Sequence, residues 1–145
     1  MLFKRVSRNQ PETVFVVVKN VSGGTMTAGY WPAWDTGASV DGVRVTQQAA
    51  ATLGACAGVC DAALANNEYG LLQVYGYRAS AYLYSSTGTS AVGDILMPVA
   101  SEWGMSPYLY AQTTTKGFGF LCAAVTASSS SQFHTTGKVF IRCLG

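Results

Sequence analysis

Turn-forming residues interrupt the first third of this chain so often that only short extended segments fit between them. A Ser-Gly-Gly triplet, further glycines and Pro32 recur every few residues between positions 21 and 42. Glycine reaches backbone angles that tight turns require, and proline fixes one of them in advance. The spacing predicts short strands over Tyr30–Asp35 and Val43–Thr46 rather than a helix.

The rest of the chain carries β-branched and aromatic runs of strand length, separated by Gly-, Asn- or Ser-rich turns. These expected strands are Thr13–Asn20, Leu71–Tyr77, Ala79–Tyr84, Ile95–Val99, Tyr108–Thr114, Phe118–Thr126 and Lys138–Leu144. The polar tract Ala127–Gly137 is expected to be a loop. The pattern predicts an all-β fold: a single compact antiparallel β-sandwich or barrel, jelly-roll-like or β-tulip-like, with many short strands and long loops.

The segment Gln47–Ala65 is rich in alanine and leucine, so a helix competes there with a strand. Gly54 and Gly58 would each cost about 1 kcal/mol inside a helix, and we therefore favour a strand over Leu53–Cys60. Asn66–Gly70 follows as a turn, because asparagine and glycine tolerate a positive φ angle.

A chain of 145 residues has the size of one domain, which we assign to residues 13–145 behind an N-terminal arm, residues 1–12. Lys4, Arg5 and Arg8 concentrate positive charge in this arm. Two interpretations remain open for it: a frayed terminus, or an arm that docks onto an acidic neighbour.

Charged residues make up only 11% of the chain, against about 25% in ordinary soluble proteins. So few charges suggest that other protein covers much of the surface, since charge repulsion and hydration normally keep proteins apart. The net charge of +2 lies in the arm, so no basic face for nucleic acid is expected. No signal peptide or membrane helix is apparent. The even number of cysteines could form two disulfides, but without a secretion signal we expect reduced, buried thiols in the cytoplasm.

The residues offer no familiar catalytic or metal-binding pattern. His134 is the only histidine, no Gly-x-Ser-x-Gly motif is present, and the cysteines lack zinc-site spacing. Five acids sit beside turn residues, where carboxylates ordinarily cap backbone N–H groups. They are Asp35, Asp41, Asp61, Glu68 and Asp94. We expect no enzyme activity, no catalytic residue, no metal and no cofactor.

Tyrosines are concentrated between positions 69 and 84, more densely than one small core needs. Tyrosine suits protein interfaces because it combines a large rigid surface with a hydrogen-bonding hydroxyl. Alternation places Tyr75 and Tyr77 on one side of their strand, and Tyr82 and Tyr84 opposite Ala81 and Leu83. We predict a subunit interface that contains Tyr69, Tyr75, Tyr77, Tyr82 and Tyr84.

Two other functions compete with that of an interface protein. Trp31, Trp34 and Trp103 suggest a carbohydrate- or receptor-binding β-module of a virion, because indole rings stack on sugars. A small hydrolase would have to use His134 as its base.

Four segments follow one another between about Val14 and Pro98. A strand that ends in asparagine leads into small residues (VVVKNVSGGTMTAGY), and a glycine-containing segment follows (TLGACAGVCDAALANNEYG). YGLLQVYGYRASAYL comes directly after it, and VGDIL is the last of the four. This arrangement resembles the capsid decoration, or cement, proteins of tailed bacteriophages.

The resemblance implies a non-enzymatic protein on the outer surface of an icosahedral head. Such a protein is assembled in the host cytoplasm, is usually a trimer, and stabilises the head by bridging major capsid protein subunits. The family places an exposed N-terminal segment against the shell, and Lys4, Arg5 and Arg8 are the matching positions here. Residues 100–145 fall outside the resemblance.

Overall fold

The computed structural model describes residues 2–7, 10–37, 41–85, 89–107, 117–126 and 133–144. Within these residues lie twelve strands and one 3-10 helix, η1 (Ala50–Ala55). The strands are β1 (Leu2–Ser7), β2 (Gln10–Asn20), β3 (Ala33–Trp34), β4 (Arg44–Thr46), β5 (Val59–Cys60), β6 (Tyr69–Ser85), β7 (Thr89–Ser90), β8 (Ile95–Pro98), β9 (Met105–Pro107), β10 (Gly119–Leu121), β11 (Val125–Thr126) and β12 (Phe133–Arg142).

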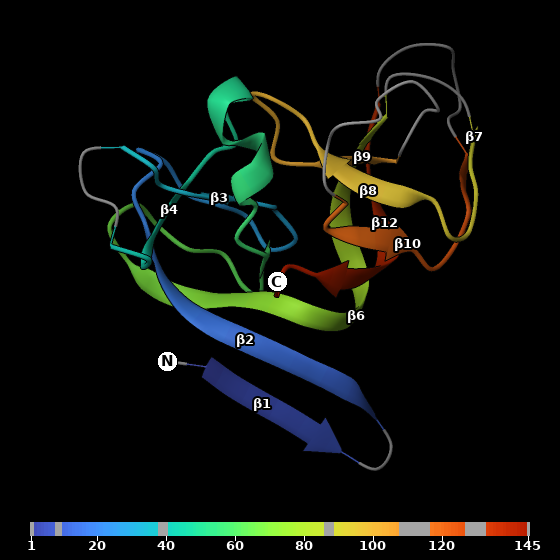
Figure 1. Cartoon of the computed structure of the whole chain (residues 1–145), viewed down its shortest axis with the longest axis horizontal. Coiled ribbons are helices and arrows are strands. Elements are labelled where there is room, and N and C mark those ends of the chain that lie inside the picture. Colours follow the sequence, from blue (N-terminus) through green and yellow to red (C-terminus); the bar gives the residue numbers. More distant parts are fainter. Residues whose placement is uncertain are drawn as a thin grey trace.

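Five strands close into a barrel. The hydrogen-bonded order β12-β10-β8-β9-β6 returns to its start because β6 also pairs with β12 (Figure 1). The pairings are antiparallel except that of β6 with β9, which is parallel at Leu83 and Met105. The all-β prediction is confirmed, and of the two predicted architectures the structure contains the barrel.

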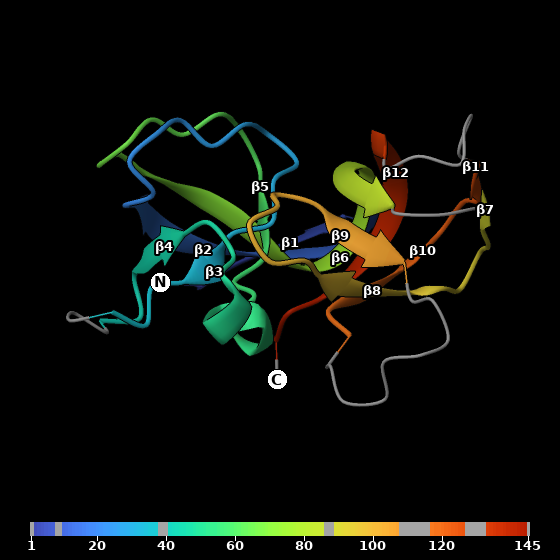
Figure 2. The same cartoon turned by 90° about the horizontal axis from the view of Figure 1, so that it is seen from above.

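The remaining strands extend this barrel into a curved sheet. β2 pairs antiparallel with the first half of β6, and β1 and β4 follow each other along the opposite edge of β2. β3 and β4 therefore lie at one end of the molecule, and β7 and β11 lie at the other (Figures 1 and 2). The small β7–β11 ribbon forms a separate sheet.

The longest strand, β6, replaces two predicted ones. Leu71–Tyr77 and Ala79–Tyr84 belong to a single strand of 17 residues. Its first half pairs with β2 and β5, and its second half pairs with β12. The two predicted strands were divided at Arg78, but β12 pairs with β6 across this position, with a bulge between Gly137 and Val139.

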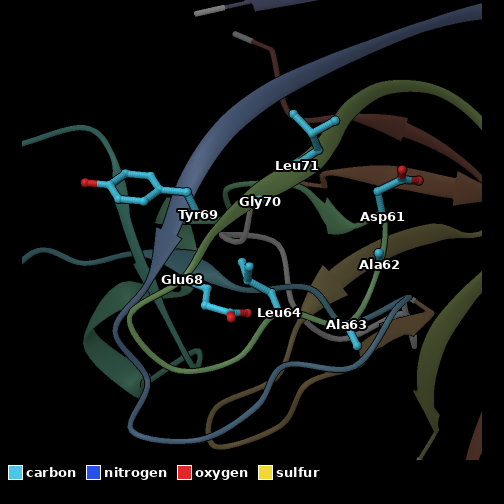
Figure 3. A pocket seen from close by; sticks show the side chains of 8 residues that line it. All are labelled: Asp61, Ala62, Ala63, Leu64, Glu68, Tyr69, Gly70 and Leu71. Carbon is cyan, nitrogen blue, oxygen red and sulfur yellow. The ribbon is translucent and has the colours of Figure 1, made fainter.

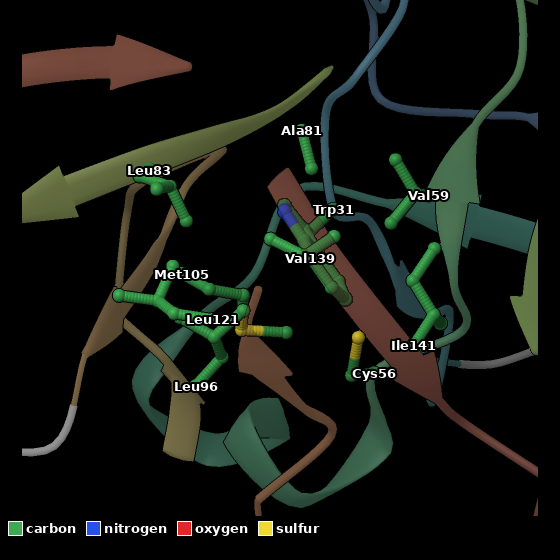
Figure 4. Packing of buried hydrophobic residues seen from close by; sticks show 10 residues of the cluster. All are labelled: Trp31, Cys56, Val59, Ala81, Leu83, Leu96, Met105, Leu121, Val139 and Ile141. Atoms are coloured by element: carbon green, nitrogen blue, oxygen red, sulfur yellow. The ribbon is translucent and has the colours of Figure 1, made fainter. Parts of the chain in front are cut away.

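Two hydrophobic clusters form on the two halves of β6. The barrel interior holds one, to which the barrel strands contribute Ala81, Leu83, Leu96, Met105, Leu121, Val139 and Ile141. Trp31, Cys56 and Val59 lie outside the barrel strands and pack into the same cluster (Figure 4). The second cluster lies between β2, β4, β5 and the first half of β6, and includes Val18, Val45, Cys60 and Leu72.

The expected strands of the N-terminal third are present, some in shortened or extended form. Thr13–Asn20 begins earlier, at Gln10, while the predicted strands Tyr30–Asp35 and Val43–Thr46 shrink to β3 and β4. The turn predicted over Asn66–Gly70 is present at Asn66 and Asn67, with a φ of 68° at Asn67, but Tyr69 and Gly70 already belong to β6. β1 runs through the predicted arm and pairs with β2, so the division into residues 1–12 and 13–145 stays a prediction.

The predicted strand Leu53–Cys60 is wrong over its first half. η1 occupies Ala50–Ala55, and only Val59–Cys60 is extended. Local hydrogen bonds explain the difference: the Thr52 hydroxyl accepts from the Ala49 N–H at 2.9 Å, and the Thr52 N–H donates to the Ala49 carbonyl. Short-range bonds of this kind compete with strand pairing.

The predicted loop Ala127–Gly137 is wrong for residues 133–137. These belong to β12, where Thr135 and Thr136 pair with Leu83 and Tyr82. Phe118–Thr126 divides into β10 and β11, and Ile95–Val99 is confirmed as β8. Tyr108–Thr114 lies outside the described residues.

The backbones of β2 and β6 approach each other closely at Gly76. Its φ is 103°, and a Cβ atom there would overlap the carbonyl oxygen of Glu12. Gly76→Ala should lower the free energy of unfolding by more than about 2 kcal/mol, because strain and overlap add. Urea unfolding measures the change.

The matched control is Gly24→Ala, because Gly24 is exposed and has no atom within 4 Å of a built Cβ. It should change stability by less than about 0.5 kcal/mol. Equal, small effects at both positions would contradict the close approach of β2 to Gly76.

Candidate interaction surface

The alternation predicted for the second half of β6 places tyrosines on the outer wall of the barrel. Ala81 and Leu83 are buried inside it, at 0% and 1% exposure. Tyr82 and Tyr84 therefore point to the opposite side, where they pair with Thr136 and His134 of β12. The sequence prediction of these two faces is confirmed.

One group of rings, which we call the Phe140 cluster, consists of Tyr75, Phe120, Phe140 and Arg142. Tyr75 meets Phe140 edge-on with ring centroids 5.2 Å apart, and Phe120 stacks on Phe140 at 5.2 Å and 12°. The Arg142 guanidinium lies 6.0 Å from the centre of the Phe120 ring. All four side chains are partly or fully exposed.

This cluster spans the barrel wall. Phe140 pairs across to Tyr77 on β6, and Phe120 pairs across to Ile95 on β8, which is 45% exposed. Val139 and Ile141 flank Phe140 in sequence and fill the barrel interior. Aromatic rings with an arginine at their margin are typical of the central part of protein interfaces.

A second group, the His134 cluster, consists of Tyr30, Tyr82, Tyr84, Trp103 and His134. Tyr30 stacks on Trp103 at 5.1 Å and 14°, and it also meets Tyr82 at 5.1 Å. The His134 ring lies 5.6 Å from Tyr82 and 5.3 Å from Tyr84. The cluster joins the segment before β3, strand β6, strand β12 and the loop before β9.

Glu102 adds a carboxylate to the His134 cluster, 3.8 Å from the His134 Nδ1 atom. Burial, followed by Tyr30 and Glu102, raises the pKa of Tyr82 above its ordinary value. A tyrosine with an ordinary pKa of about 10 is already protonated at neutral pH, so Tyr82 can donate a hydrogen bond there. The group combines stacking surfaces with a hydrogen-bond donor and a carboxylate.

Tyr69 and Leu71 form a third exposed site at the start of β6. Tyr69 is 64% exposed and Leu71 is 39% exposed, and the Lys19 ammonium lies 5.8 Å from the Tyr69 ring centre. Beside them is a pocket of about 250 Å³ between Asp61–Ala63 and β6 (Figure 3).

Both acids that line this pocket already hold the local structure. The Asp61 carboxylate accepts from the Arg78 guanidinium at 3.2 Å, and Glu68 accepts from the Ala65 N–H at 3.1 Å. Arg78 also donates to the Cys60 carbonyl at 2.8 Å, which ties the turn to β6. The pocket therefore offers an apolar and aromatic surface more than free charge.

The turn-capping role predicted for the acids is found in four of the five. Asp35 accepts from the Gly37 N–H, Asp94 from the Ala91 N–H, and Glu68 as described above. Asp41 accepts from two backbone N–H groups, of Val43 and Arg44, which lower its pKa. Asp61 instead pairs with Arg78.

The five tyrosines predicted at one interface thus lie in three places. Tyr75 belongs to the Phe140 cluster, which Tyr77 adjoins, and Tyr69 lies beside the pocket. Tyr82 and Tyr84 belong to the His134 cluster, where Tyr84 is only 9% exposed and so offers little surface to a partner. In the predicted arm, Lys4 and Arg5 lie on β1, and Arg8 lies outside the described residues.

The three tryptophans do not form the sugar-binding face that their number suggested. Trp31 is fully buried in the barrel core, and Trp34 packs against the second cluster. Trp103 also packs against the second cluster, and it is the one tryptophan that stacks within the His134 cluster. His134, expected in a loop, lies on β12 because the strand starts at Phe133.

Sequence reasoning missed Phe120 and Phe140 as partly exposed residues, and Tyr30 as a member of the His134 cluster. A signal for Phe140 was present in the alternation Val139, Phe140, Ile141, Arg142, which puts Phe140 and Arg142 on one face. Tyr30 carried no such signal, because its partners Trp103 and Tyr82 are distant in sequence.

Two negative findings concern the described part of the chain. No three side chains of His, Cys, Asp or Glu in it come together as metal ligands would. No helix in it is long and apolar enough to cross a membrane.

Comparison with known proteins gives a structural relative rather than a family. No family model matches the sequence, and no curated protein matches it either. The fold is similar to that of the head fiber gp8.5 N base in bacteriophage phi29, with a TM-score of 0.53 and 15% sequence identity. The match covers 90% of this chain and 95% of the phi29 chain, so the two share their fold over nearly their whole length.

Proposed function

We propose that this chain is a non-enzymatic structural protein of a bacteriophage head. In this proposal it binds the outer surface of the icosahedral shell as a decoration protein, through its outer rings and its basic arm. It associates as a homotrimer and stabilises the head by bridging subunits of the major capsid protein.

The observation that carries the proposal is the fold match to the phi29 head fiber base. It extends over 90% of one chain and 95% of the other, although only 15% of the residues are identical. The independent resemblance to decoration proteins, over about Val14 to Pro98, supports the same location.

The outer surface of the barrel supports a role in assembly. The Phe140 cluster places partly exposed rings on the barrel wall, and His134 and Tyr82 of the His134 cluster are also at least partly exposed. Charged residues make up only 11% of the chain. Exposed rings do not stabilise an isolated protein, because their apolar surface stays in water. In a protein covered by neighbours the same surface is buried, and this burial favours assembly. Symmetric repetition on a shell multiplies each small contact.

In this proposal the Phe140 cluster and the basic arm bind different partners. The Phe140 cluster, with Tyr77 beside it, contacts a second copy of the chain. The basic arm contacts the major capsid protein, because Lys4, Arg5 and Arg8 hold three of the nine positive charges within eight residues. Attraction of this kind steers binding and weakens with added salt.

Charge reversal tests the arm. A variant with Lys4→Glu, Arg5→Glu and Arg8→Glu should bind heads assembled without the protein at least about tenfold more weakly, because attraction becomes repulsion. Co-sedimentation with heads at two salt concentrations measures the affinity. Size-exclusion chromatography checks that the variant keeps its oligomeric state.

The matched control is Lys138→Glu, at an exposed position on β12 away from the arm. It should leave head binding within about twofold of the unmodified protein. Equal losses in both variants would reject a specific role for the arm, and no binding by the unmodified protein would reject the proposed function.

Removal of the Tyr75 ring tests the Phe140 cluster. Tyr75→Ala should weaken self-association by at least about tenfold, because the ring supplies interface area. It should lower the free energy of unfolding by only about 1–2 kcal/mol, since the side chain is half-buried. Sedimentation velocity measures self-association, and urea unfolding of the dissociated chain measures the free energy of unfolding.

Thr136→Ala, on the exposed side of the same strand pair, serves as the control and should change neither quantity appreciably. A stability loss for Tyr75→Ala with unchanged self-association would place this ring in the fold rather than in an interface.

A further inference from the structure

Two of the four cysteines face each other although 87 residues separate them in the sequence. The Sγ atoms of Cys56 and Cys143 lie 3.9 Å apart. Cys56 is 4% exposed and belongs to the barrel core, against which Cys143 also packs. Figure 4 shows Cys56 beside Ile141, two residues before Cys143.

The backbone holds both residues in place on either side of this contact. The Cys143 N–H donates to the Val74 carbonyl at 2.8 Å, and Cys56 forms an isolated bridge with Ala33. The Cys143 thiol also lies 3.8 Å from the Phe118 carbonyl. The two sulfur atoms therefore meet between segments that other bonds fix.

We propose that Cys56 and Cys143 are a dithiol site that closes to an intramolecular disulfide when it meets a small-molecule disulfide such as oxidised glutathione. Closure requires the sulfur atoms to approach from 3.9 Å to about 2.05 Å. The site does not depend on the proposed function, and its test needs no phage head.

The reaction runs by two thiol–disulfide exchanges. Cys143 is the more exposed member of the pair, since it is half-buried whereas Cys56 is only 4% exposed. Its thiolate attacks one sulfur of the small disulfide, a mixed disulfide forms, and one small thiolate leaves with the proton that Cys143 gave up. Cys56, after losing its proton, attacks the Cys143 sulfur and releases the second small thiol.

In total, two protein thiols are oxidised to one disulfide, and one small disulfide is reduced to two thiols. The contact with Cys56, followed by burial, raises the pKa of Cys143 well above its ordinary value. The attacking thiolate is therefore scarce at neutral pH, and the reaction is slow. A reducing compartment keeps the pair open, in agreement with the reduced cysteines expected from the sequence.

The bond would fix the C-terminal end of β12 to the segment that joins η1 to β5. The bond closes a loop of 87 residues. A cross-link that closes a longer loop stabilises the fold more, because it removes more conformational entropy from the unfolded chain. The oxidised protein is accordingly the more heat-stable form.

The test treats the reduced full-length protein with oxidised glutathione at pH 8, followed by an alkylating agent. Mass spectrometry should show the loss of two hydrogen atoms and, after digestion, one peptide pair joined through Cys56 and Cys143. The melting temperature should rise by at least about 5 °C and return after reduction.

Variants distinguish this bond from other thiol chemistry. Cys56→Ser should accumulate glutathione on Cys143, because the resolving thiol is gone, and the double variant Cys60→Ser, Cys122→Ser should still close the bond. Cys60 is an internal control, since burial raises its pKa to about 12 and it should stay unmodified.

Three results would overturn the proposal in the unmodified protein: glutathione only on Cys122, a different cysteine pair, or a bond between Cys56 and Cys143 that appears only in denaturant. The unmodified protein alone decides the question, so a failure of Cys56→Ser to fold leaves the test intact.

Discussion

The close approach of β2 and β6 at Gly76 is the constraint on which the rest of the structure depends. There the glycine adopts a φ of 103°, and its missing side chain leaves room for the Glu12 carbonyl. At this point β6 changes partners, from β2 and β5 in its first half to β12 in its second. One strand thereby joins the barrel to the sheet that carries the N-terminal hairpin.

The surfaces follow from this shared strand and its partner β12. Alternation sends Ala81, Leu83, Val139 and Ile141 into the barrel, so the residues between them must face outward. In this protein those residues are mostly aromatic, and they collect as the Phe140 and His134 clusters. The same geometry that fills the core supplies the rings that we propose for assembly.

The sequence contains enough to predict the strands and their two faces, but not the closure of the barrel. The alternation around Tyr82 and Tyr84 and the turn at Asn67 could be predicted, because both features depend on residues that are neighbours in sequence. The pairing of β6 with β12, the stacking of Tyr30 on Trp103 and the contact of Cys56 with Cys143 join distant segments. The start of β12 at Phe133 was missed for the same reason, since only its pairing with β6 makes that polar stretch a strand.

The central claim is that this barrel is a component of a phage head, and a reconstruction of the intact particle tests it most directly. The account predicts copies on the outer surface of the shell, related by threefold symmetry, with the β1–β2 hairpin against the major capsid protein and the Phe140 cluster between copies. A particle whose outer surface lacks this barrel would contradict the account.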